Sequence, residues 1–185
     1  MLTASTQGIP LGIIEQEVWS RNEVESGKAE QRKQKPTAQK ESQRWLDSLM
    51  KTESITPNHL QVVTIAEREA DFYDLFACGE HLGSDFLIRA VQNRCLAGSQ
   101  KRLWETLLSV EPQGTMTVEV KRNPTRPARK AVLTIRYTTV TLQPPQNRAK
   151  KEQLAPLTLQ AILVKEVDPP TGIEPITWLL LTTLD

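Results

Sequence analysis

Apolar and polar residues follow different patterns in the two halves of this chain. Between residues 40 and 91, apolar positions fall at helical spacing in two segments and in short, nearly continuous runs in two others. This pattern predicts, in chain order, a helix, a strand, a helix and a strand over Lys40–Lys51, Leu60–Ile65, Glu69–Ala77 and Asp85–Ala90. Such alternation favours an α/β layer structure, in which Val62, Val63 and Ile65 would form a buried strand.

In the second half, apolar residues recur mainly at every second position. A short amphipathic helix at Arg102–Val110 comes first, and Pro and Gly turns separate the segments that follow. We expect a small antiparallel sheet of four strands over 116–120, 131–137, 157–167 and 175–183. Residues 1–19 are predicted to form a hairpin, and the polar residues 20–39 an exposed loop. The predicted parts are therefore an α/β layer at 1–91, a β-rich part at 92–175 and a returning strand at 176–185.

Composition narrows the class of protein. The chain has 185 residues, 38% hydrophobic and 24% charged, with a net charge of +1, so it suits a folded domain with a real core. The longest apolar run, Ile176–Leu181, is far shorter than the ~20 residues that a membrane span needs. Residues 1–20 lack the pattern of a secretory signal. Cys78 and Cys95 fit neither a disulfide framework nor a zinc site, which favours reduced thiols in the cytoplasm.

The first candidate site is the acidic segment Glu67-Arg68-Glu69-Ala70-Asp71. It lies where a predicted strand ends and a helix begins, which is where sites form in open α/β sheets. Carboxylates at this place can hold Mg²⁺ through oxygen ligands. The same acids would also suit an ordinary helix N-terminus, because acidic side chains there interact favourably with the helix dipole.

Three further features bear on nucleic-acid binding. The turn between two predicted strands carries five positive charges and no acid: Lys121, Arg122, Arg126, Arg129 and Lys130. An exposed basic turn suits phosphate contacts, although a charge run can also be a solvated loop. Arg148, Lys150 and Lys151 form another basic group in the next loop. Trp178 is either a core residue or a platform on which an unpaired base stacks.

Together these segments resemble the bacterial cut-and-paste DDE transposases of the Tn-five kind, in the insertion-sequence-four-like group. Ala66–Asp71 is similar to the family's Asp-Arg-Glu-Ala-Asp signature, and Phe86–Arg89 resembles the next strand, which ends in arginine. Arg126–Ala131 resembles a basic segment of the family's inserted β-subdomain, and Trp178–Thr182 resembles the strand that leaves it. The matches keep the family's order from about Leu2 to Thr183.

The resemblance implies an incomplete ribonuclease-H-like core with an inserted β-rich subdomain. It implies transposon-end cleavage and strand transfer with Mg²⁺, DNA as the partner, and a transposase dimer in the intact family. Glu67 stands at the position of the family's middle aspartate, so it is the expected catalytic residue and metal ligand. The expected DNA-binding residues are those of the basic turn (Arg122, Arg126, Arg129 and Lys130), with Arg89 and Trp178, which take the family's roles at a DNA hairpin with a flipped base.

Three departures from the family shape the expectation for function. The family's first aspartate would lie before Leu2 and its last glutamate beyond Asp185, and Glu67 replaces an aspartate. Mg²⁺ tolerates little change in geometry, so we expect a truncated transposase fragment that is inactive on its own, with two open strand edges. The alternatives are a non-catalytic DNA-binding module and a decayed gene product.

Overall fold

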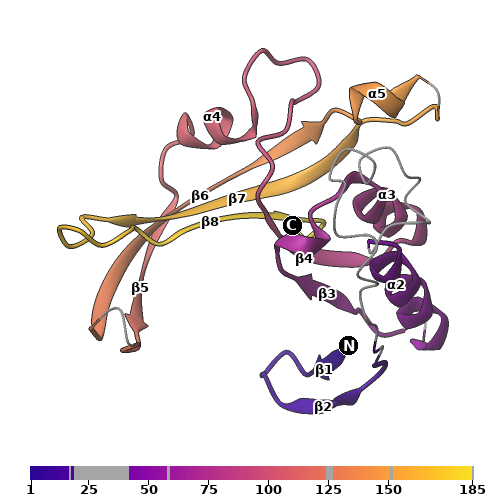
Figure 1. The fold of residues 1–185 in the computed structure, drawn as a ribbon, viewed down its shortest axis with the longest axis horizontal. Helices are drawn as coiled ribbons and strands as arrows, with labels where there is room; N and C mark the ends of the chain where they lie inside the picture. Colours follow the sequence, from indigo (N-terminus) through magenta and orange to yellow (C-terminus); the bar gives the residue numbers. More distant parts are fainter. Residues whose placement is uncertain (17, 19–41, 58, 124–126, 151, 185) are drawn as a thin grey trace, which may run out of the picture. The chain divides into compact units, whose positions relative to one another are not determined.

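The computed structural model describes residues 1–185 apart from 17, 19–41, 58, 124–126, 151 and 185 (Figure 1). The predicted loop at 20–39 and the basic-turn residue Arg126 therefore lie outside the described residues. The chain divides into two compact units, Met1–Val62 and Val63–Asp185. Within the described part, no helix is both long and apolar enough to cross a membrane.

The first unit contains a hairpin and one helix. Strands β1 (Leu2–Ala4) and β2 (Pro10–Ile13) pair antiparallel, which confirms the predicted hairpin, although β2 is shorter than expected. The turn places Gly8 at φ +79°, a conformation that suits glycine. Helix α2 (Gln43–Ile55) begins and ends a few residues later than predicted and buries Leu49 and Thr52.

The second unit is built on a six-stranded sheet with the strand order β3-β4-β8-β7-β6-β5. The strands β3 and β4 pair in parallel, whereas all other neighbours pair antiparallel. In chain order the strands are β3 (Val63–Ala66), β4 (Asp85–Ala90), β5 (Gly114–Val120), β6 (Arg129–Leu142), β7 (Leu157–Val167) and β8 (Thr177–Thr182). The prediction that the last four strands form a small sheet of their own is wrong. Because β8 pairs with both β4 and β7, these four strands extend the parallel pair.

Short helices connect these strands. They are the 3₁₀-helix η3 (Arg68–Ala70), α3 (Tyr73–Leu82), α4 (Leu103–Leu108) and α5 (Gln146–Ala149). The helix predicted at Glu69–Ala77 is thus divided, since Asp71 and Phe72 adopt non-helical backbone angles between η3 and α3. Helix α3 ends at Gly83, whose φ of +67° closes the helix in the left-handed conformation.

The sheet buries one face near β4. There Phe86 and Ile88 on β4 are buried, as are Leu179 and Leu181 on β8. The ring of Phe86 stacks on Phe76 of α3, with centroids 5.3 Å apart. A Cβ added to Gly79 of α3 would lie 3.0 Å from the Phe86 ring, so the absent side chain permits this close approach. The core of the second unit therefore lies between α3 and this face.

A second apolar cluster lies farther along the sheet. It contains Val120, Ala131, Leu133 and Val164, with partly buried neighbours around it. On β7 the consecutive residues Leu163 and Val164 are both buried, so both faces of this strand are covered at that point. Figure 1 shows β6 and β7 as long, bent strands, which fits a sheet whose buried face changes along its length.

The observed fold is therefore mixed α/β. The prediction that Ile65 is buried is wrong: its side chain is 74% exposed, because β3 is an edge strand and Ile65 lies on the face opposite α3. The boundaries predicted after residues 91 and 175 both lie inside the second unit, before α4 and before β8, and they stay predictions.

Candidate functional site

Glu67 and Arg89 meet at the ends of the two parallel strands. The register pairs Ala66 with Ile88. The next residues along the two strands, Glu67 and Arg89, therefore lie beside each other. The Arg89 Nη1 donates a hydrogen bond of 3.3 Å to Glu67 Oε2. Glu67 is also the N-cap residue of η3, but its side chain makes no capping hydrogen bond. Its carboxylate is 72% exposed and therefore points into solvent beside Arg89.

Arg89 also contacts Trp178. The β4–β8 register pairs Arg89 with Leu180, and alternation places Trp178 on the same face, two residues away. The guanidinium carbon of Arg89 lies 5.3 Å from the centroid of the Trp178 ring, within the range of a cation–π contact. Three residues that the resemblance singled out, from three different segments, thus form one contiguous group: Glu67, Arg89 and Trp178.

Trp178 is 47% exposed, whereas the neighbouring Leu179 and Leu181 are almost fully buried. This confirms the prediction that the aliphatic face of the strand is buried and that Trp178 is partly exposed. An exposed indole edge and face are what a stacking partner requires. That a nucleic-acid base stacks there stays a prediction.

Asp71, the last acid of the segment, has a different role. Its carboxylate is buried and accepts hydrogen bonds from the backbone N–H groups of Val91 (2.7 Å) and Gln92 (2.9 Å). Arg94 donates to the other carboxylate oxygen at 2.5 Å. Burial lowers the pKa of Arg94, and the charge of Asp71 opposes this shift. Asp71 therefore holds the chain after β4 in place, a structural role that local sequence patterns did not indicate.

Two acids of the segment, Glu67 and Asp71, already have hydrogen-bond partners within the protein. Glu67 is bonded to a guanidinium, and Asp71 is buried with its oxygens engaged by Arg94 and two backbone N–H groups. No group of three or more His, Cys, Asp or Glu side chains suited to a metal ion occurs among the residues that the structure describes. Mg²⁺ prefers near-octahedral oxygen coordination, and Glu67 can supply at most two of the six ligands.

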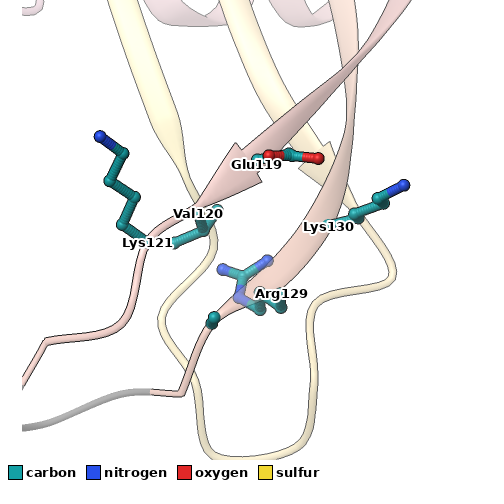
Figure 2. A pocket seen from close by; sticks show the side chains of 6 residues that line it. Glu119, Val120, Lys121, Arg129 and Lys130 are labelled. Atoms are coloured by element: carbon teal, nitrogen blue, oxygen red, sulfur yellow. The ribbon is translucent and has the colours of Figure 1, made fainter.

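The basic turn lies at the far end of β5 and β6. A cavity of about 340 Å³ occurs there, lined by Glu119, Val120, Lys121, Ala128, Arg129 and Lys130. Figure 2 shows Lys121 and Lys130 extending to opposite sides, with Arg129 between them. Lys121, Arg122 and Lys130 are exposed, so they are free to approach a polyanion.

Arg129 differs from its neighbours because it is bound to Glu166. Its Nη2 donates to Glu166 Oε2 at 2.9 Å, and its Nη1 donates to Oε1. Glu166 is buried and also accepts the backbone N–H of Ile176 at 2.9 Å. The charge of Arg129 is therefore balanced inside the protein, and the structure gives this residue a packing role that its position in the basic turn did not suggest.

In the other basic group, Arg148 is paired in a similar way, whereas Lys150 is exposed and Lys151 lies outside the described residues. Arg148 donates to Asp74 at 2.9 and 2.7 Å and to Glu152 at 2.8 and 2.6 Å. The hydrogen bonds with Glu152 and Asp74 raise the pKa of Arg148. Arg148 therefore links α5 to α3 through its ion pair with Asp74, and it adds little to a basic surface.

No protein-family model matches the chain. The relationship to cut-and-paste transposases is therefore a proposal.

Proposed function

We propose that this chain is a DNA-binding protein of transposase origin that does not cut DNA on its own. The observation that carries the proposal is the contact of Arg89 with both Glu67 and Trp178. The resemblance names these residues from separate motifs, and a guanidinium beside an exposed indole suits a phosphate and an unpaired base together.

The topology supports an inserted β-rich subdomain in a ribonuclease-H-like core. After β4 the chain forms β5, β6 and β7, which extend the same sheet, and β8 then pairs with β4 directly. An insertion is expected to leave and re-enter a fold at neighbouring points, because its own strands then disturb the host sheet least. The parallel pair β3–β4 would belong to the core, and β5, β6 and β7 to the insertion.

The chemistry favours binding over cleavage by these residues alone. The exposed Lys121, Arg122 and Lys130 would contact phosphates, and Trp178 would stack on a base. Glu67 is one carboxylate, and it forms an ion pair with Arg89. Transposon-end cleavage with Mg²⁺ is therefore proposed only for an assembly that supplies further acids. A cytoplasmic location fits this reading, since both cysteines are free thiols.

A decayed gene product without function is the second candidate. A decayed product should bind DNA no better than background. The half-exposed Trp178 beside Arg89 is a surface that could stack on a base, and it therefore supports the binding protein.

The test is binding of fluorescein-labelled single-stranded DNA, followed by anisotropy at low salt. We expect Trp178→Ala to weaken binding about tenfold, because stacking on one base is worth ~1–3 kcal/mol. Trp104→Ala, a change of the same kind on α4, is the matched control and should leave affinity unchanged. Wild-type binding no tighter than that of an unrelated protein of equal charge would refute the proposal.

A further inference from the structure

The exposed carboxylate of Glu67 has one well-defined partner in the described structure, the guanidinium of Arg89. We propose that Glu67 is a positioning residue: it holds Arg89 over the Trp178 indole, and the three residues bind DNA without a metal ion. This inference rests on the proposed function. It assigns Glu67 a role different from the metal ligand that the resemblance implies.

The geometry of Arg89 supports this role. Its side chain is 22% exposed, one end of the guanidinium reaches Glu67, and its carbon lies 5.3 Å from the indole centroid. A long arginine side chain without such an anchor samples many rotamers, and ordering it costs entropy at the time of binding. An anchor on the neighbouring strand reduces this cost in advance, which is how preorganisation strengthens binding.

Charge argues in the same direction. A divalent cation at Glu67 would lie close to the positive charge of Arg89, and like charges repel at this range. Glu67 can offer only two oxygens to the cation, whereas Mg²⁺ takes six ligands. Pairing with Arg89 therefore competes with metal binding for the same carboxylate.

The first experiment reports on Trp178 without DNA. A protein with Trp19→Phe, Trp45→Phe and Trp104→Phe keeps Trp178 as its only tryptophan, since the chain has four. In this background we expect Glu67→Gln to raise the acrylamide quenching constant about twofold, because Arg89 no longer covers one face of the indole. Arg89→Gln should give the same rise, and the double variant should add nothing further.

Titration with MgCl₂ provides the opposing outcome. If Glu67 pairs with Arg89 and does not bind the metal, millimolar Mg²⁺ leaves Trp178 emission unchanged in the protein with native Glu67. A Mg²⁺-dependent change that is absent in Glu67→Gln would show that Glu67 binds the metal, and it would overturn the proposal. Unchanged quenching in Glu67→Gln would overturn it as well. Glu67 is 72% exposed, so this substitution should not disturb folding.

The second experiment measures single-stranded DNA binding in EDTA. Removing an exposed carboxylate ordinarily strengthens DNA binding, because a repulsion is lost. A positioning role predicts that DNA affinity falls instead. Glu67→Gln should bind DNA about two- to fivefold more weakly, as expected for an exposed ion pair. Glu69→Gln makes the same charge change two residues away and should not weaken binding.

DNA binding by the wild-type chain and by Glu67→Gln tests the proposed function and the positioning role separately. If the wild-type chain fails to bind DNA, the proposed function fails. If it binds DNA and Glu67→Gln binds equally well or more tightly, the positioning role alone fails.

Discussion

The guanidinium of Arg129 is bound to the buried carboxylate of Glu166, on a strand 37 residues away in sequence. The side chains are 12% and 2% exposed, so the pair is largely out of solvent. Glu166 also accepts the backbone N–H of Ile176, which precedes β8. The pair therefore joins the start of β6 to the end of β7 and to the residue that precedes β8.

Arg129→Met should lower the free energy of unfolding by about 3–5 kcal/mol, because it leaves a buried carboxylate without its partner. The measurement is urea denaturation followed by circular dichroism. Lys130→Met removes the same charge from the adjacent, exposed residue and should change stability by less than about 0.5 kcal/mol. Equal effects of the two changes would mean that the Arg129–Glu166 pair does not stabilise the fold.

Asp71→Ala should also destabilise the protein, by about 3–5 kcal/mol, because Arg94 and two backbone N–H groups lose their acceptor. The exposed Glu80→Ala on α3 is the control for loss of an acid in the same region. Thermal melts of the two variants provide the comparison. A melting temperature of the Asp71 variant close to that of the control would contradict a structural role.

Replacing Lys121, Arg122 and Lys130 by glutamine should flatten the salt dependence of single-stranded DNA binding. Each lost phosphate contact lowers the slope of log affinity against log salt by about 0.7. Lys101→Gln, an exposed lysine in a loop away from the turn, serves as the control for net charge. A slope that stays the same in the triple variant would remove the basic turn from the DNA interface.

The edge strand β3 should promote self-association. In the described structure β4 is its one partner strand, and Ile65 is 74% exposed on it. We expect Ile65→Lys to reduce aggregation at high protein concentration with little change in stability, as measured by light scattering and size-exclusion chromatography. Leu108→Lys changes a residue that is 51% exposed on a helix and should have a smaller effect.

Burial raises the pKa of the Cys78 thiol above its usual value of 9.0. In a Cys95→Ser background, thiolate absorbance at 240 nm should therefore appear at a higher pH in the folded chain than in the urea-unfolded chain. A raised pKa also means that this thiol's contribution to stability is complete below pH ~9 and is lost as the pH rises through the folded-state value. A thiolate transition at the same pH in both states would contradict the effect of burial.

Local patterns in the sequence determined much of the secondary structure and part of the site. Alternation predicted that Leu179 and Leu181 are buried and that Trp178 faces a more open environment, because strand neighbours point to opposite faces. The predicted hairpin and the strand at 157–167 were also found. These features depend on neighbours within a few residues, which is the range that a periodic pattern reports.

The tertiary structure alone decided which residues become partners. Glu67 meets Arg89 22 residues away, and Arg129 meets Glu166 37 residues away, through pairing between strands. It also decided that Ile65 is exposed, since that follows from the edge position of β3 and not from its apolar sequence. Strand order and register set these contacts, and both depend on long-range closure of the sheet, which local periodicity does not encode.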